Sequence, residues 1–141
     1  MTTEAEKIRS VLVVDEEKML EGLLNRVAEH IAIDKQGGVH LKGTKYRDVD
    51  RVALYLLGKH LAFRAKLIDH DIAGYKEVAR ETGLSAASAS ARLLDLRRRN
   101  RIESPRKGMN RIIFARASDI LDEIDSAMRR RGGVAIVGET A

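Results

Sequence analysis

The chain has 141 residues, with 26 lysine and arginine side chains against 21 aspartate and glutamate side chains and a formal net charge of +5 at pH 7. It contains no cysteine, which excludes disulfides, thiolate metal sites and a cysteine nucleophile. No apolar run approaches the roughly 20 residues that span a bilayer, and the acidic start of the chain lacks the chemistry of a secretory signal, so we expect a cytoplasmic protein that makes no membrane contact.

The N-terminal region, residues 1–45, is predicted to be a helical extension with a possible short hairpin. Residues 10–14 are β-prone and predict a short strand or an ordered arm. Asp15 can cap a helix that continues to about His30, because apolar residues recur there at helical spacing.

Two further elements follow this helix. The glycine pair Gly37-Gly38 separates residues 31–33 from residues 39–41, and these two short runs could pair as a small hairpin. A second helix is predicted from about Asp48 to Leu67, and residues 69–74 are predicted to form a loop.

The next segment predicts a helix, a glycine turn and another helix. Val78 and Ala79 place apolar groups on one face of the first helix, and Gly83 stands where the chain must turn sharply. Ser85 offers a hydroxyl that can cap the second helix, residues 86–99. The inward stripe of this second helix is formed by Ala89, Leu93 and Leu96.

A basic hairpin is expected directly after this helix. Asn100 tolerates the left-handed backbone of a helix stop. Residues 102–104 and 112–114 are apolar-rich runs that flank the turn sequence 105–108, in which Pro and Gly are suitably placed.

The C-terminal helix is predicted over residues 117–131, with Ser118 as its cap and Gly132-Gly133 as its end, which leaves residues 132–141 as a flexible tail. This helix and the one over residues 15–31 each carry an apolar stripe. A small core cannot easily cover both stripes, so we expect a homodimer that forms through one or both helices. The alternative is that both helices fold back onto their own domain.

The positive charge is concentrated in one segment. Residues 1–73 hold 12 basic and 12 acidic side chains, residues 74–116 hold 11 basic and 4 acidic, and residues 117–141 hold 3 basic and 5 acidic. The whole positive excess therefore coincides with the predicted helix–turn–helix and hairpin. This coincidence favours nucleic-acid binding over a solvated basic face without a partner.

The order Leu-Ser-Ala-Ala-Ser-Ala-Ser-Ala-Arg-Leu at 84–93 resembles the recognition region of winged helix–turn–helix regulators, including the ArsR-like and Lrp/AsnC-like families. The resemblance covers roughly residues 49–116, within a domain that we place at 46–116. It implies a mainly α fold with a small β-hairpin wing, here with extra N- and C-terminal helices. Ala91 and Leu94 stand where those families usually carry polar or basic residues, which predicts modest sequence specificity.

The predicted DNA contacts lie on the second helix and on the hairpin. Small or apolar side chains would approach the major groove, serines would contact phosphates or single base atoms, and cations would neutralise phosphates. Arg97 and Arg99 are left undecided, because three consecutive helical positions cannot all reach the same backbone. The candidate residues are Ser85, Ala87, Ser88, Ser90, Ala91, Leu94, Arg98, Arg101, Arg106, Lys107 and Arg111.

Catalytic patterns are missing from the sequence. The four histidines share no i, i+4 spacing, the three adjacent residues 69–71 rarely converge on one cation, and Gly37-Gly38 lacks the Lys-Ser/Thr of a phosphate-binding loop. We therefore expect no enzyme activity, no cofactor and no metal, and no small-molecule effector is specified by any motif.

The sequence predicts a transcription regulator that binds double-stranded DNA as a homodimer. Scarce amides (three Asn, one Gln) and an excess of Arg over Lys, 17 to 9, fit an archaeal or thermophilic prokaryote. Two alternatives remain open at this point: a non-specific architectural DNA-binding protein, and a winged-helix module for protein–protein interaction.

Overall fold

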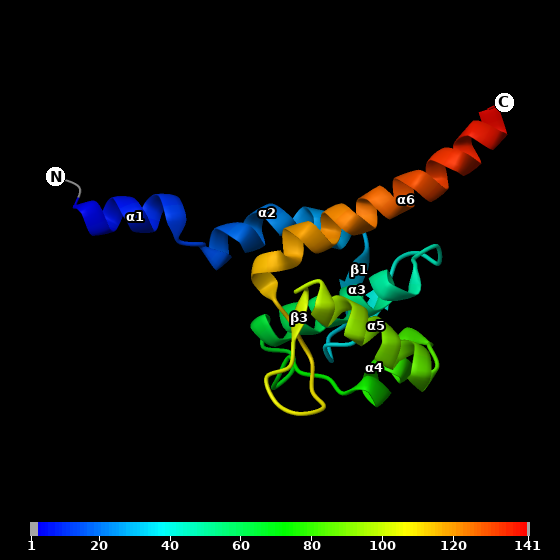
Figure 1. Ribbon diagram of the computed structural model, residues 1–141, viewed down its shortest axis with the longest axis horizontal. Coiled ribbons are helices and arrows are strands. Elements are labelled where there is room, and N and C mark those ends of the chain that lie inside the picture. The colour runs from blue at the N-terminus through cyan, green and yellow to red at the C-terminus, as the bar shows by residue number, and fades with distance from the viewer. Residues whose placement is uncertain (1–2, 141) are drawn as a thin grey trace.

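A computed structural model describes residues 3–140, with side chains except at position 16 and from position 131 onward. It is mainly helical and includes two short antiparallel hairpins, β1–β2 and β3–β4 (Figure 1). No helix among these residues is long and apolar enough to cross a membrane. The elements in chain order are α1 (Glu4–Leu12), α2 (Glu16–Ala28), β1 (Ile31–Ile33), β2 (Val39–Leu41), α3 (Asp48–Arg64), α4 (Tyr75–Thr82), α5 (Ala86–Arg98), β3 (Ile102–Glu103), β4 (Arg111–Ile112), a 3₁₀ turn (Phe114–Arg116) and α6 (Ala117–Thr140).

Helix α3 is the centre of the core. Val52, Leu54, Leu56 and Leu57 are fully buried, so α3 is apolar around most of its circumference, as expected of a helix surrounded by others. It contacts α4, α5 and α6 as well as strands β1, β2 and β4. At Gly58 an added Cβ would lie 2.6 Å from Cγ1 of Val39, so the glycine allows β2 to pack directly against the α3 backbone.

Helices α4 and α5 form as the sequence predicts. Gly83 adopts φ +73°, the left-handed conformation that ends α4, and Ser85 is the N-cap of α5. Asn100, with φ +58°, adopts the predicted left-handed backbone after α5. The predicted stripe of Ala89, Leu93 and Leu96 is buried against the core.

The second hairpin is shorter than predicted. Strand residues pair as Ile102 with Ile112 and Glu103 with Arg111, so the strands cover 102–103 and 111–112 instead of 102–104 and 112–114. Phe114 leaves the strand because it begins the 3₁₀ turn, where its ring is buried and stacks on His60 with 4.9 Å between ring centroids. The intervening residues 104–110 are called the hairpin loop below.

The structure contradicts the expected strand or arm at residues 10–14. This segment contains the end of α1, whose start is fixed by a capping box: Thr3 Oγ1 accepts from the backbone N–H of Glu6, and the Glu6 carboxylate accepts from the backbone N–H of Thr3. The following cap is as predicted, with Asp15 accepting from the backbone N–H groups of residues 17 and 18 at the start of α2.

The first hairpin is confirmed, and the register of β1 and β2 pairs Ile31 with Leu41 and Ile33 with Val39. The C-terminal helix starts at the predicted residue but differs from the prediction in its cap and in its end. It begins at Ala117, so Ser118 lies inside α6 and is not its cap, and it continues through Gly132-Gly133 to Thr140. A glycine inside a helix costs about 1 kcal/mol relative to alanine, which weakens a helix without necessarily ending it.

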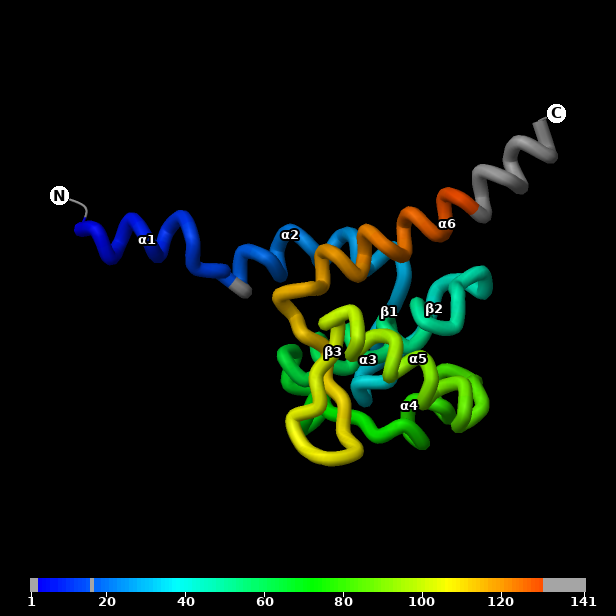
Figure 2. The backbone as a smooth tube through the Cα atoms, viewed as in Figure 1, coloured from blue at the N-terminus to red at the C-terminus, as the bar shows by residue number. Residues whose placement is uncertain are grey.

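Helices α2 and α6 lie side by side (Figure 2). Each covers part of the other's apolar stripe. Leu23 and Val27 of α2 and Ile120 and Ile124 of α6 are all buried within one chain. The dimer was predicted from the apolar stripes of these two helices. Much of that apolar surface is covered within one chain, as in the alternative that both helices fold back onto their own domain.

Candidate nucleic-acid interface

The outer face of α5 is the surface opposite its buried stripe. Ala87, Leu94 and Arg98 are exposed there and Ala91 is half-buried. Because Ala87, Ala91, Leu94 and Arg98 follow the helical repeat, they form one strip along the helix. Three of the four are apolar and two are alanines, so a flat or grooved partner can approach the backbone of α5 closely.

The three serines of this region differ in their contacts and in their exposure. Ser85 Oγ accepts the backbone N–H of Ser88 at 3.1 Å, which caps α5. Ser85 remains exposed, so its hydroxyl can still donate to a further acceptor. Ser88 is half-buried, and Ser90 is exposed on the side of α5 that faces the hairpin loop, where it lines a pocket of about 170 Å³.

Asn110 fixes the hairpin loop against two other parts of the chain. This residue is 3% exposed, and its side-chain amide donates to the carbonyl of Ala73 at 3.0 Å. The backbones of Asn110 and Ala73 also exchange two hydrogen bonds of 2.9 Å each. Arg97, near the end of α5, donates to Oδ1 of Asn110 at 2.7 Å. The hairpin loop, α5 and the segment before α4 are therefore held together through one buried amide.

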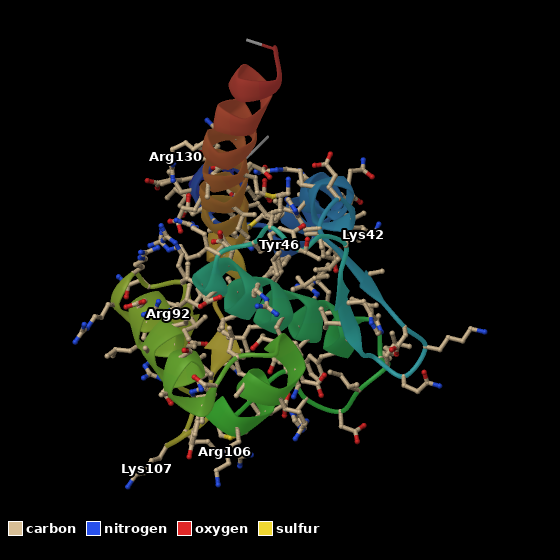
Figure 3. All side chains as sticks on the ribbon, turned by 90° about the vertical axis from the view of Figure 1, so that its right-hand side faces the viewer. Lys42, Tyr46, Arg92, Arg106, Lys107 and Arg130 are labelled. Atoms are coloured by element: carbon tan, nitrogen blue, oxygen red, sulfur yellow. The ribbon has the colours of Figure 1, made fainter. Side chains whose placement is uncertain are left out.

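Four cations around this junction have no partner among the described residues. Arg98 lies on the outer face of α5, Arg106 and Lys107 lie on the hairpin loop, and Lys76 lies in the first turn of α4. Figure 3 shows Arg106 and Lys107 projecting into solvent at the end of the molecule opposite α6. The four acidic residues of the same segment are all engaged in ion pairs, namely Glu77, Glu81, Asp95 and Glu103.

Two of the predicted contact residues are paired with acids. Arg101 donates to Oε1 of Glu123 on α6 at 2.5 and 3.1 Å, and its side chain is only 19% exposed. Arg111 donates to Glu103 across the β3–β4 pair at 2.6 and 3.1 Å, and this hydrogen bond raises the pKa of Arg111. Arg101 is therefore not a free cation, and the charge of Arg111 is neutralised by Glu103.

Lys76 and Asn110 were not among the predicted site residues. Helix α4 begins beside the hairpin loop, because Tyr75 and Gly108 line the same pocket, and Lys76 directly follows Tyr75 in the first turn of this helix. The role of Asn110 depends on Ala73, which is 37 positions away, so no local spacing indicates it. Arg97, left undecided from sequence, is assigned by the structure to the support of the loop.

Among the described residues, no group of three or more His, Asp or Glu side chains could hold a metal ion. Comparisons with protein-family models, with curated proteins and with solved structures found no match.

Proposed function

We propose that the protein binds double-stranded DNA as a winged helix–turn–helix protein, with α5 in the major groove and the hairpin loop against the neighbouring phosphates. The order α3, α4, the Gly83 turn, α5 and a short hairpin supports this fold assignment. The observation that carries the proposal is the charge pattern. Lys76, Arg98, Arg106 and Lys107 are exposed and have no partner in the described part of the chain, while every acid between residues 74 and 116 is already paired.

The chemistry of the outer face of α5 suits weak base readout. Ala87, Ala91 and Leu94 can contact thymine methyl groups, but none of them can form the bidentate hydrogen bonds that discriminate strongly between bases. Affinity would then come mainly from phosphate contacts and depend steeply on salt. In a homodimer, two α5 helices about 34 Å apart would contact successive turns of the major groove, as in a transcription regulator.

The test is a binding titration on random-sequence duplex DNA over a series of salt concentrations. We expect the double variant Arg106→Ala, Lys107→Ala to lower affinity on the order of 10-fold at low salt, equally on all sequences. The slope of log K against log salt should fall by roughly one unit for each lost contact.

A matched control removes two positive charges elsewhere. Lys18→Ala with Arg130→Ala changes two exposed cations on α2 and α6 that have no partner among the described residues. Arg130 lies at the end of the molecule opposite Arg106 and Lys107 (Figure 3). This control should shift affinity by less than about 3-fold, because charges beyond a Debye length are screened. An equal loss in both double variants would contradict contact through the hairpin loop. A wild-type protein that binds no duplex would favour the protein-interaction module, and uniform binding to all sequences would favour the architectural role.

A further inference from the structure

Helix α1 exposes an apolar face that no described residue of its own chain covers. No residue of α1 is buried, and the exposed fractions of Ile8, Val11 and Leu12 are 48%, 77% and 74%. The next two residues, Val13 and Val14, are each 58% exposed. A helix of nine residues is too short to be stable alone in water, where about 12–15 residues are marginal. Its capping box helps locally, but stable helix formation requires a packing partner for the apolar face.

A mainly apolar groove that could accept this face lies beside α2. It has a volume of about 580 Å³ and lies between α2, β1 and the C-terminal end of α3. Its floor is apolar, and Leu24 is 48% exposed there. The apolar floor consists of Leu20, Leu24, Val27, Ile31, Ile33 and Leu61.

The charges at the two edges are complementary. Lys7 and Arg9 flank Ile8 at about 100° on either side of the α1 stripe, and neither cation has an acidic partner among the described residues. Glu17 and Glu21, one helical turn apart on α2, line the groove on one side, and both are exposed with no partner among the described residues. Arg64 lines the groove on the α3 side and already has an interaction of its own. An α1 helix seated in the groove would bury its apolar stripe and bring at least one of its cations to this acidic edge.

The connection between α1 and α2 prevents α1 from reaching the groove of its own chain without rearrangement. Val13 (φ −84°, ψ 128°) and Asp15 (φ −97°, ψ 101°) are extended, and the Asp15 side chain is held as the cap of α2. As a result α1 points away from the body of the molecule (Figure 1). Docking onto a neighbouring molecule leaves this connection unchanged.

We propose that α1 of one chain docks in the α2–β1–α3 groove of a second copy, and that the exchange is reciprocal in a two-fold dimer. This proposal specifies which surfaces form the homodimer of the proposed function, and it rests on the proposed function only for the existence of that homodimer. It lies away from α5 and the hairpin loop, so its test needs no DNA and can fail or succeed independently of DNA binding.

The first test is the mass in solution, measured by light scattering on the full chain. We expect the wild type at twice the 15.7 kDa of one chain and Val11→Glu with Leu12→Glu at 15.7 kDa. Leu24→Glu, on the groove side, should also be monomeric. Ser10→Glu on the polar face of α1 is the matched control and should remain dimeric. A monomeric wild type, a dimeric Leu24→Glu variant or a monomeric control would each overturn the proposal.

The second test uses the absence of cysteine from the chain. A chain carrying Leu12→Cys is mixed with one carrying Leu24→Cys under oxidising conditions. Docking of α1 in the partner's groove predicts a mixed disulfide-linked dimer as the main product, at least several-fold above the dimer from a Ser10→Cys and Leu24→Cys mixture. Equal yields from the two mixtures would contradict the assigned face of α1.

Discussion

Charged side chains are arranged in opposite ways at the helix interfaces and at the hairpin loop. Between α2 and α6, Arg26 donates to Asp122 at 2.8 Å and to Asp125 at 2.9 Å, and His30 is buried between Asp125 and Tyr46. On the hairpin loop, cations of the same kind have no partner in the described chain. The net charge of +5 does not distinguish paired cations from unpaired ones. Only the ion pairs in the structure show which cations remain available to a ligand.

This contrast predicts a separation of effects. Removing a paired group at a helix interface should lower stability and leave DNA affinity nearly unchanged, because a cation already neutralised contributes little to the field at the binding surface. Removing an unpaired cation of the hairpin loop should do the reverse, since no described residue pairs with its charge.

The largest expected effect is on the contact between α3 and α4. Glu77 accepts from Lys59 and from the hydroxyl of Tyr55, each at 2.5 Å, and the Lys59 side chain is only 10% exposed. Burial acts to raise the pKa of Glu77, but the hydrogen bonds from Lys59 and Tyr55 outweigh it and lower the pKa below its ordinary value. Glu77→Gln leaves a buried ammonium without a counter-charge, and we expect a loss of about 3 kcal/mol in the free energy of unfolding, measured by chemical denaturation.

The control for this prediction is Glu81→Gln. Glu81 is exposed and pairs with Arg80 at 3.4 Å, so its removal should cost less than about 0.5 kcal/mol. Equal losses in the two variants would show that burial of Lys59 is unimportant.

A smaller and pH-dependent effect is expected at the α2–α6 interface. Partial burial acts to raise the pKa of Asp125, but hydrogen bonds from Arg26 and His30 outweigh it and lower the pKa below its ordinary value. A carboxylate whose folded-state pKa is lowered stabilises the fold above its unfolded pKa, near 4, and loses this contribution as the pH falls through the folded value. Asp125→Asn should therefore cost about 1–2 kcal/mol at pH 7, with the difference from wild type shrinking below about pH 4.

Asp122→Asn is the matched control, because Asp122 shares Arg26 but its side chain is 64% exposed. It should cost less than about 1 kcal/mol at pH 7. A loss for Asp125→Asn that stays constant down to pH 2 would contradict an ionic origin.

The smallest expected effect converts a paired cation into an unpaired one. Glu103→Gln removes the partner of Arg111 from an exposed cross-strand pair, so stability should change by less than about 1 kcal/mol. If the hairpin loop contacts phosphates, the freed Arg111 should raise duplex affinity by a few-fold and steepen the salt slope by up to roughly one unit. A lower affinity in the same titration would place Arg111 outside the interface.

Local rules account for most of the helix boundaries that the sequence predicted correctly. Asp15 and Ser85 act as caps, and Gly83 and Asn100 adopt left-handed backbones, because each of these features depends on residues within one turn. The same kind of signal was available for α1, since Thr3 and Glu6 have the spacing of a capping box. The prediction for this segment used only the β-prone residues 10–14, and the predicted strand was wrong.

Local rules could not predict which cations of the candidate interface are paired. Arg101 and Glu123 are far apart in the chain, and only the position of α6 beside the start of β3 brings them together. The hydrogen bond from Arg97 to Asn110 likewise depends on where the hairpin returns to α5. Spacing along one helix indicates which side chains point outward, but it cannot show which of them meet an acid from another element.

The buried amide of Asn110 has a consequence for the thermodynamics of association. Since it joins the hairpin loop to α5 and to the segment before α4, the two surfaces offered to a duplex keep one relative orientation before any partner arrives. Such preorganisation avoids most of the conformational entropy that would be lost if a mobile loop became ordered on binding. Rapid association, with little change in backbone conformation between the free and bound protein, is what this arrangement favours.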